Sequence, residues 1–181
     1  AQQEADAAMA KNWTATGGVL TGAADAGVIG SAKNYENFEL ILEWKTEAEA
    51  GLGVRSIPQI ALGGKNSGAL TGNRLHDNTS PKAAANSPRE WNTMQVKVVS
   101  DRVTVLLNGI TTAENVILEN ACNREIPAYA QGQLLLIAGK APVSVREMYV
   151  RELPATPRFE LSEEEAHEGF EVLFDGMSMH K

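Results

Sequence analysis

The sequence predicts an all-β protein, a sandwich of two antiparallel sheets with short peripheral helices. Residues 93–98 alternate between polar and apolar side chains, and residues 102–107 do so again. This period of two is typical of a strand with one buried face. Asn108-Gly109 then supplies the positive φ angles that a tight type I′ turn needs. Such a ribbon is only marginally stable alone, so further strands must pack on it. Sixteen glycines and repeated turn signals favour the same class.

The first part of the chain predicts an arm, a hairpin and a central strand. Residues 1–12 are rich in Ala, Gln and Glu and predict a short N-terminal helix or arm. A β-sandwich domain follows over 13–155, and Gly17-Gly18 predicts a hairpin turn near its start. Residues 38–45 carry apolar bulk on both faces, which is typical of a strand in the middle of a sheet.

Four further segments continue the sandwich. Residues 54–60 predict a strand that its proline confines to an edge or interrupts. Residues 63–89 form a long polar stretch, and long ordered loops in compact domains are often functional. The apolar run 132–138 predicts a strand covered on both faces. Residues 143–153 alternate again, and a shift of one residue near Arg146-Glu147 indicates a β-bulge.

The C-terminal part predicts a linker and one more strand. Residues 156–168 are acidic, and Ser162 three positions before Glu165 fits a capping box, so we expect a short linker helix. Residues 169–181 begin with alternating apolar side chains. This segment predicts a strand that needs a sheet to join, because alone it would leave its apolar side chains in water.

Composition limits the partners. The formal net charge is −7, which argues against nucleic acid or an anionic membrane and is compatible with a neutral ligand such as a sugar. No apolar run reaches the length of a membrane-spanning helix. The one cysteine, Cys122, excludes an intramolecular disulfide. The chain begins at Ala1 without methionine, which indicates a mature chain after signal removal or a chain cut there. We therefore expect a periplasmic, cell-surface or secreted protein.

Several segments together resemble the 3-keto-disaccharide hydrolase domain family of Bacteroidetes and Planctomycetes. The resemblance covers about 13–153, and the matching segments are NYENFELILEWK, GVRSIPQI, SGAL, REWNTMQVKV, RVTVLLNG, GQLLLIAG and VREMYVREL. Members look like concanavalin A-type lectins and glucanases, with two large antiparallel sheets of which one is concave. The resemblance implies a jelly-roll sandwich with glycan binding or glycosidic bond cleavage on the concave face.

The implied chemistry acts on glycosides already oxidised at the sugar 3-position. The ketone acidifies the neighbouring C–H, so a base can drive β-elimination. Such a site needs the base, a group that polarises the keto oxygen, and partners for sugar hydroxyls. The family's Glu-x-Gln-Ile-x-Asp segment aligns with residues 57–62, where Gln59 is kept and Ile57 and Leu62 replace both carboxylates. Since aliphatic side chains cannot accept a proton, a catalytically diverged glycan-binding, accessory or interaction domain is the alternative.

Four residues are candidates for substrate binding. Arg55 could hydrogen-bond sugar hydroxyls with its planar fork of donors, or could form a structural salt bridge or lie solvated at the surface. Gln59 could be a ligand-facing amide or a strand-edge amide bonded to its neighbours. Trp91 could stack on a sugar ring, although core or rim packing is the commoner fate of tryptophan. Arg74 lies in the long polar loop.

The same loop holds the candidates for catalysis. His76 beside Asp77 could act as a general base, although a lone pair is a weak signal. No metal site is predicted from His or Cys spacing. Asp25, Asp77 and Asn78 could take part in a calcium site, but nothing in the sequence fixes its geometry.

The C-terminal segment 169–181 looks like the opening strand of the same family, Gly-Phe followed by Leu-Phe-Asp-Gly. Nothing of this kind precedes Trp13. The segment therefore either completes the sandwich or starts a second, tandem domain. We expect residues 169–175 to pair with the sandwich, within the chain or in a strand-swapped homodimer.

Overall fold

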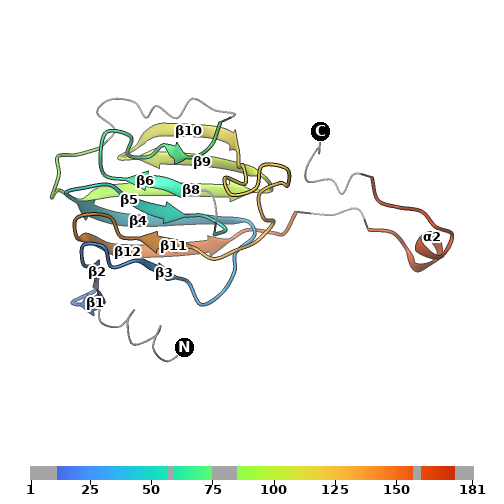
Figure 1. Cartoon of the computed structure of the whole chain (residues 1–181), viewed down its shortest axis with the longest axis horizontal. Helices are drawn as coiled ribbons and strands as arrows, with labels where there is room; N and C mark the ends of the chain where they lie inside the picture. The colour runs from blue at the N-terminus through green and yellow to red at the C-terminus, as the bar shows by residue number, and fades with distance from the viewer. Residues whose placement is uncertain (1–11, 57–58, 75–84, 157–159, 174–181) are drawn as a thin grey trace.

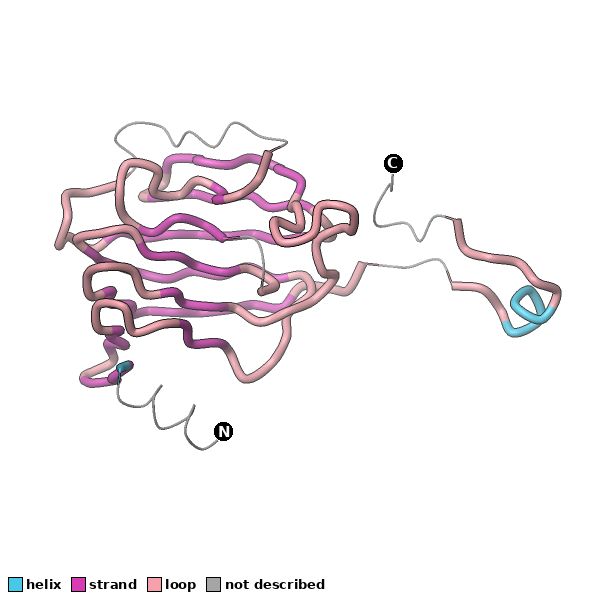
Figure 2. The backbone as a smooth tube through the Cα atoms, viewed as in Figure 1, coloured by secondary structure: helices cyan, strands magenta, loops and turns pink. Residues whose placement is uncertain are grey.

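Two antiparallel sheets lie face to face and form the body of the molecule in the computed structural model (Figures 1 and 2). The structure describes residues 12–56, 59–74, 85–156 and 160–173. The all-β sandwich is therefore confirmed. The arm predicted over 1–12 lies outside the described residues except for Asn12.

The larger sheet has seven strands in the order β1-β2-β12-β4-β8-β9-β10. Their bounds are β1 Trp13–Thr16, β2 Val19–Gly22, β4 Phe38–Thr46, β8 Asn92–Val99, β9 Arg102–Leu107, β10 Ile110–Ile117 and β12 Val143–Glu152. The predicted hairpins are confirmed, because β1 pairs with β2 and β9 with β10 across their turns. β4 lies between β12 and β8, as its apolar residues predict.

The smaller sheet has five strands in the order β3-β11-β5-β6-β7. Their bounds are β3 Val28–Gly30, β5 Ala50–Gly53, β6 Gln59–Leu62, β7 Leu70–Thr71 and β11 Leu135–Ile137. One predicted boundary is wrong here, because the strand expected over 54–60 is replaced by β5, a turn at 54–56, and β6. Gly51 and Gly53 belong to β5, and their missing side chains leave room for Ile137 and Leu135 of β11.

The core lies between the sheets and is built by alternate residues of each strand. Phe38, Leu40, Leu42 and Trp44 of β4 point inward and are all but fully buried. The smaller sheet contributes four residues to the same core, namely Leu52, Ile60, Leu62 and Leu136. The bulge predicted in β12 is confirmed by a register shift between Arg146 and Tyr149, and Glu147 has φ 48°.

The chain beyond β12 leaves both sheets. Asn37 Nδ2 donates to Pro154 O at 2.7 Å and to Thr156 Oγ1 at 2.9 Å, which anchors the exit. The linker helix is α2, Glu163–His167, with the predicted capping box between Ser162 and Glu165. The described part of the last segment, 169–173, forms no strand and lies outside both sheets. Residues 174–181 lie outside the described residues.

Candidate functional site

Arg55 is buried and binds the protein itself. Its side chain is 1% exposed, and Nε and Nη2 both donate to Glu36 O, at 2.8 and 2.6 Å. Nη1 donates to Tyr129 O at 3.3 Å. Because these donors already have protein acceptors, a sugar could use them only by displacing the chain. The described contacts give Arg55 a structural role, with backbone carbonyls among its acceptors.

The turn that carries Arg55 is backbone-strained. Arg55 and Ser56 have φ 51° and 76°, in the left-handed region that costs energy for residues with a Cβ. Gly132 packs directly against this turn, since a Cβ there would lie 2.6 Å from Arg55 C and O. The strained turn is therefore held by burial and close packing around the guanidinium.

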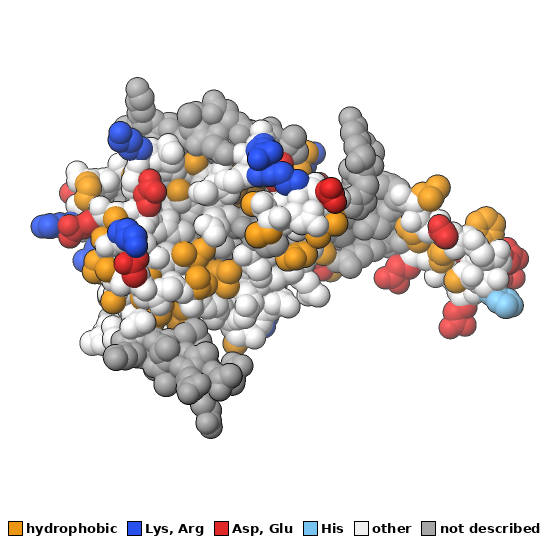
Figure 3. All heavy atoms as spheres, in the orientation of Figure 1, with side chains coloured by type: hydrophobic (Ala, Val, Ile, Leu, Met, Phe, Trp, Pro, Cys, Tyr) orange, Lys and Arg blue, Asp and Glu red, His pale blue; other side chains and the backbone are white. Residues whose placement is uncertain are grey.

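Gln59 and Leu62 point to opposite sides of β6. Leu62 is fully buried in the core, so a carboxylate at this position would face the sandwich interior. Gln59 lies on the outer face of the smaller sheet, with Oε1 3.4 Å from where a Cβ of Gly51 would be. That face is mostly aliphatic, and hydrophobic side chains gather over β11 and β5 (Figure 3). Val28, Leu135 and Ile137 belong to it. Gln59 thus lies beside an aliphatic patch.

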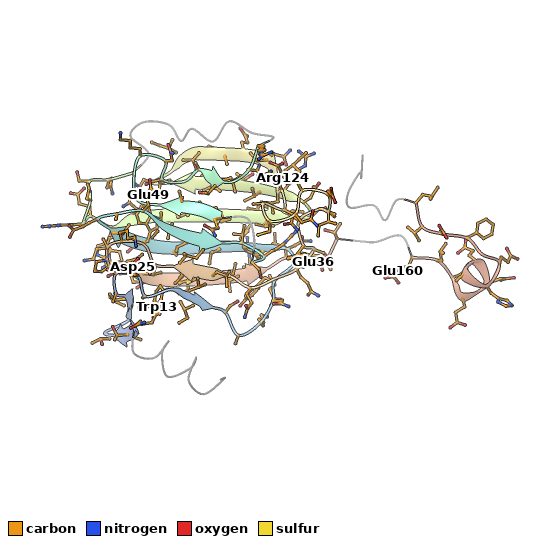
Figure 4. The ribbon with its side chains drawn as sticks, in the orientation of Figure 1. Trp13, Asp25, Glu36, Glu49, Arg124 and Glu160 are labelled. Carbon is orange, nitrogen blue, oxygen red and sulfur yellow. The ribbon has the colours of Figure 1, made fainter. Side chains whose placement is uncertain are left out.

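The long loop contributes one described candidate, Arg74. Its side chain is exposed, and its backbone N–H donates to Glu119. Glu119 accepts from Arg124 (labelled in Figure 4), which also donates to Gly72 O directly after β7. His76, Asp77 and Asn78 lie outside the described residues. Catalysis by His76 with Asp77, and the calcium site, therefore stay predictions.

Asp25, the third proposed calcium ligand, is paired with Lys140 Nζ at 3.0 Å. Over the described ranges no group of three or more His, Cys, Asp or Glu is arranged to hold a metal ion. Among the same residues, no helix has the length and apolar character to cross a membrane.

Trp91 is the predicted residue that joins a cluster of charged side chains. The guanidinium carbon of Arg146 lies 4.1 Å from the centroid of the half-buried indole ring, and Lys45 Nζ lies 4.8 Å from it. Arg146 Nε also donates to Glu43 Oε2 at 2.6 Å. We call Trp91, Lys45, Arg146 and Glu43 the Trp91 cluster. It lies on the outer face of the larger sheet.

Strand register places the Trp91 cluster there. Asn92, the next residue, is buried, and its Oδ1 accepts from Asn86 N at 2.7 Å and Asn108 Nδ2 at 2.9 Å. Since successive side chains alternate, Trp91 must face outward. Arg146 and Glu43 are register partners on β12 and β4. Sequence reasoning missed both, because the pairing joins positions 103 residues apart.

Several polar groups of this face are available to a ligand. No described residue accepts a hydrogen bond from Arg146 Nη1 or Nη2, and none forms an ion pair with Lys45. The donors project from the same face as Glu43, so the cluster offers cationic donors and an anionic acceptor beside an aromatic ring. This combination suits hydroxyl-rich ligands.

Charged side chains continue along the same face. Glu39 accepts a hydrogen bond from Arg151 and pairs with Lys97 Nζ at 3.5 Å. The hydrogen bond from Arg151 is the main reason that the pKa of Glu39 lies below its usual value. The Tyr149 hydroxyl donates to the Glu147 carboxylate, which raises the pKa of Tyr149. The face is therefore ionic and aromatic, unlike the aliphatic face of the smaller sheet.

The four predicted substrate-binding residues do not form one site. Arg55 is buried at the end of the sheets marked by Glu36, whereas the Trp91 cluster lies near the other end of β4, towards Glu49 (Figure 4). Gln59 is on the opposite face of the sandwich from Trp91. We therefore take the Trp91 cluster as the candidate site.

Comparison with known proteins decides the family. A model described as a 3-keto-alpha-glucoside-1,2-lyase-like domain matches residues 2–151. The chain belongs to this family. The 3-keto-alpha-glucoside-1,2-lyase-like domain thus spans both sheets and ends within β12, one residue before the end of that strand. None of the curated proteins compared with the chain matches it significantly.

Solved structures share the fold of this 3-keto-alpha-glucoside-1,2-lyase-like domain. A candidate glycosyl hydrolase from Parabacteroides distasonis ATCC 8503 matches with a TM-score of 0.64 and 22% identity, over 79% of this chain and 91% of that one. Another from the same organism has a TM-score of 0.61 and 18% identity, over 80% and 84%. The carbohydrate-binding module CBM66 from Bacillus subtilis has a TM-score of 0.54 and 13% identity, over 77% and 91%. At these identities the likeness shows the fold alone.

Proposed function

We propose that the domain binds a glycan on the outer face of the seven-stranded sheet, at the Trp91 cluster. The observation that carries the proposal is the stacking of Arg146 on Trp91 together with its hydrogen bond to Glu43. Membership in a family described by its action on glucosides supports a carbohydrate ligand.

The physical basis is the mixed character of a sugar. One face of a pyranose ring presents C–H groups, which pack on an aromatic ring, and its rim presents hydroxyls. The planar fork of Arg146 is held in place by Trp91 and Glu43, so little side-chain entropy is lost when it binds hydroxyls. Glu43 supplies the complementary acceptor. We further propose that this ligand is met outside the cytoplasm.

The second candidate function is lyase activity on 3-keto-glucosides, which the family description favours. A base would remove the proton at C2, next to the ketone, and the bond from C1 to its oxygen would break, with the leaving group taking up a proton. His76 is the proposed base. Binding is the better-supported function, because Leu62, which the resemblance to the family aligns with a carboxylate, is an aliphatic residue that faces the core.

Binding can be tested by titrating the full chain with trehalose, glucosides and their 3-keto derivatives in a calorimeter. We expect Trp91→Ala to weaken the best ligand roughly tenfold or more, as for loss of an aromatic stacking partner. Tyr129→Ala is the matched control, because Tyr129 is an aromatic residue at the surface that lies apart from the cluster. Equal losses in both variants, or no loss in either, would reject the Trp91 cluster as the site.

Turnover is measured separately, by following loss of 3-keto-trehalose. Turnover that His76→Ala abolishes, while the affinity for the unoxidised sugar is unchanged, would establish the lyase. Binding without turnover would support the glycan-binding function alone.

A further inference from the structure

The sandwich has an open side at one edge of β12. β2 pairs with β12 only at Val143–Val145, so the β12 backbone from Glu147 to Glu152 has a strand partner on the β4 side alone within the described sheet. Three large side chains are exposed along this stretch: Met148 at 40%, Tyr149 at 61% and Val150 at 39%. An exposed, apolar strand edge is a template for pairing with another strand.

An apolar cavity opens beside that edge and leads between the sheets. Its volume is about 290 Å³. Met148 and Val150 line it from β12, and Leu134 and Leu136 line it from the region of β11. Leu40 forms part of its inner wall. An additional strand beside β12 would therefore place its inward-facing side chains in this cavity.

The chain itself carries a strand-like segment without a sheet. In the described part of 169–175, Phe170 is 60% exposed, Val172 43% and Leu173 95%. The alternation puts Phe170, Val172 and Phe174 on one side and Glu171, Leu173 and Asp175 on the other. Phe170, Val172 and Phe174 are apolar and two residues apart, so as a strand they would all face an apolar cavity on one side.

We propose that residues 169–175 of a second copy of this chain add to the free edge of β12 as an antiparallel strand. Phe170, Val172 and Phe174 fill the cavity between the sheets. In the single chain the described part of the segment is exposed. Twelve residues join the segment to the anchored Thr156, and they can span roughly 40 Å, so the segment can extend away from its own sandwich to another copy. Exchange of an identical element between copies satisfies both surfaces at once.

One register matches the middle of the new strand on both faces, and it sets Phe170 at the mouth of the cavity opposite Glu152, whose carboxylate pairs with Lys33 Nζ at 2.5 Å. If Glu152 opposes Phe170, then Val150 opposes Val172 on the inner side, where Val150 already lines the cavity. On the outer side Arg151 opposes Glu171, so opposite charges meet across the strands. Main-chain hydrogen bonds of the added strand would supply affinity and the three apolar side chains specificity.

Analytical ultracentrifugation of the full chain over a range of concentrations tests the proposal. We expect a monomer–dimer equilibrium whose dissociation constant rises roughly tenfold or more in Val172→Asp, since the variant places a charge in the cavity. Leu173→Asp is the matched control, because residue 173 faces outward in this register, and it should leave the equilibrium unchanged. A chain that stays monomeric at every concentration, or a dimer unaffected by Val172→Asp, overturns the proposal.

A disulfide experiment identifies the chain that supplies the strand. Val150→Cys and Val172→Cys are placed on separate chains that also carry Cys122→Ser, and the two are mixed and oxidised. Cross-linked dimers are expected, because positions 150 and 172 oppose each other across the interface. If the dimer forms without this cross-link, or if a chain carrying both cysteines closes only on itself, the second copy is not the occupant. Circular dichroism confirms that each variant is folded.

Discussion

The carbonyl oxygen of Glu36 accepts two hydrogen bonds from the single guanidinium of Arg55, from Nε at 2.8 Å and from Nη2 at 2.6 Å. Glu36 lies two residues before β4, and Arg55 lies in the turn between β5 and β6. One side chain therefore ties the larger sheet to the smaller. The contact with Tyr129 O adds a third segment.

We expect Arg55→Ala to reduce the free energy of unfolding by about 2–4 kcal/mol, because buried carbonyl acceptors lose their donors and a cavity is left. Arg55→Lys should recover only part of this, since an ammonium lacks the planar fork. Urea unfolding followed by tryptophan fluorescence measures both. A variant of normal stability with weakened sugar binding would instead assign Arg55 to the ligand.

Gly132→Ala should destabilise the protein by about 1–3 kcal/mol, because its Cβ would meet the backbone of Arg55 at 2.6 Å. Gly17→Ala provides the comparison. Gly17 has φ 58° with open space around it, so its cost is backbone strain of roughly 1 kcal/mol alone. Thermal unfolding of the two variants separates crowding from strain. A smaller loss for Gly132→Ala than for Gly17→Ala would contradict close packing at the Arg55 turn.

Glu43→Gln is expected to weaken glycan binding several-fold while changing stability by less than about 1 kcal/mol, as for other partly exposed ion pairs. The carboxylate holds Arg146 Nε at 2.6 Å, and its loss lets the guanidinium move away from Trp91. Glu47→Gln is the control, because Glu47 pairs with Arg89 at an exposed position. Calorimetric titration with the best sugar reports the difference.

The pair of Glu39 and Arg151 predicts a pH dependence of stability. The pKa of Glu39 is lower in the folded protein than its ordinary value, so folding favours the ionised form. This contribution is complete above the unfolded pKa, near 4.3, and is lost as the pH falls through the folded pKa. The stability difference between wild type and Glu39→Gln should therefore shrink on acidification below about pH 4. Thermal unfolding between neutral and acidic pH measures this stability difference. A difference that grows towards low pH would contradict the claim that folding favours the ionised form of Glu39.

Local pattern was enough to predict most strands. The alternation around Asn108-Gly109 gave β8, β9 and their turn, and the displaced alternation in residues 143–153 gave the bulge of β12. These features are determined by residues that are close together in the sequence, so a local pattern is enough to predict them. The strand β5 was missed for the opposite reason. Gly51 and Gly53 are needed for contact with β11, more than eighty residues away.

The candidate site depended even more on distant pairing. Trp91 could be named as an aromatic residue at a strand start, but its partner Arg146 depends on the register between β12 and β4. Arg55 stood out for its side-chain chemistry, yet its acceptors are main-chain carbonyls that any residue could provide. Side-chain identity alone therefore could not separate the structural arginine from the one at the surface.

The position of β12 between β2 and β4 also orders the assembly of the protein during translation. The meander of β8, β9 and β10 can pair with β4 as soon as residue 117 has left the ribosome, whereas the N-terminal hairpin meets the larger sheet only through Val143–Val145. Within the larger sheet, the first two strands in the sequence must therefore wait for β12. A nascent chain arrested before residue 143 would hold an unattached hairpin, in need of a chaperone until β12 emerges.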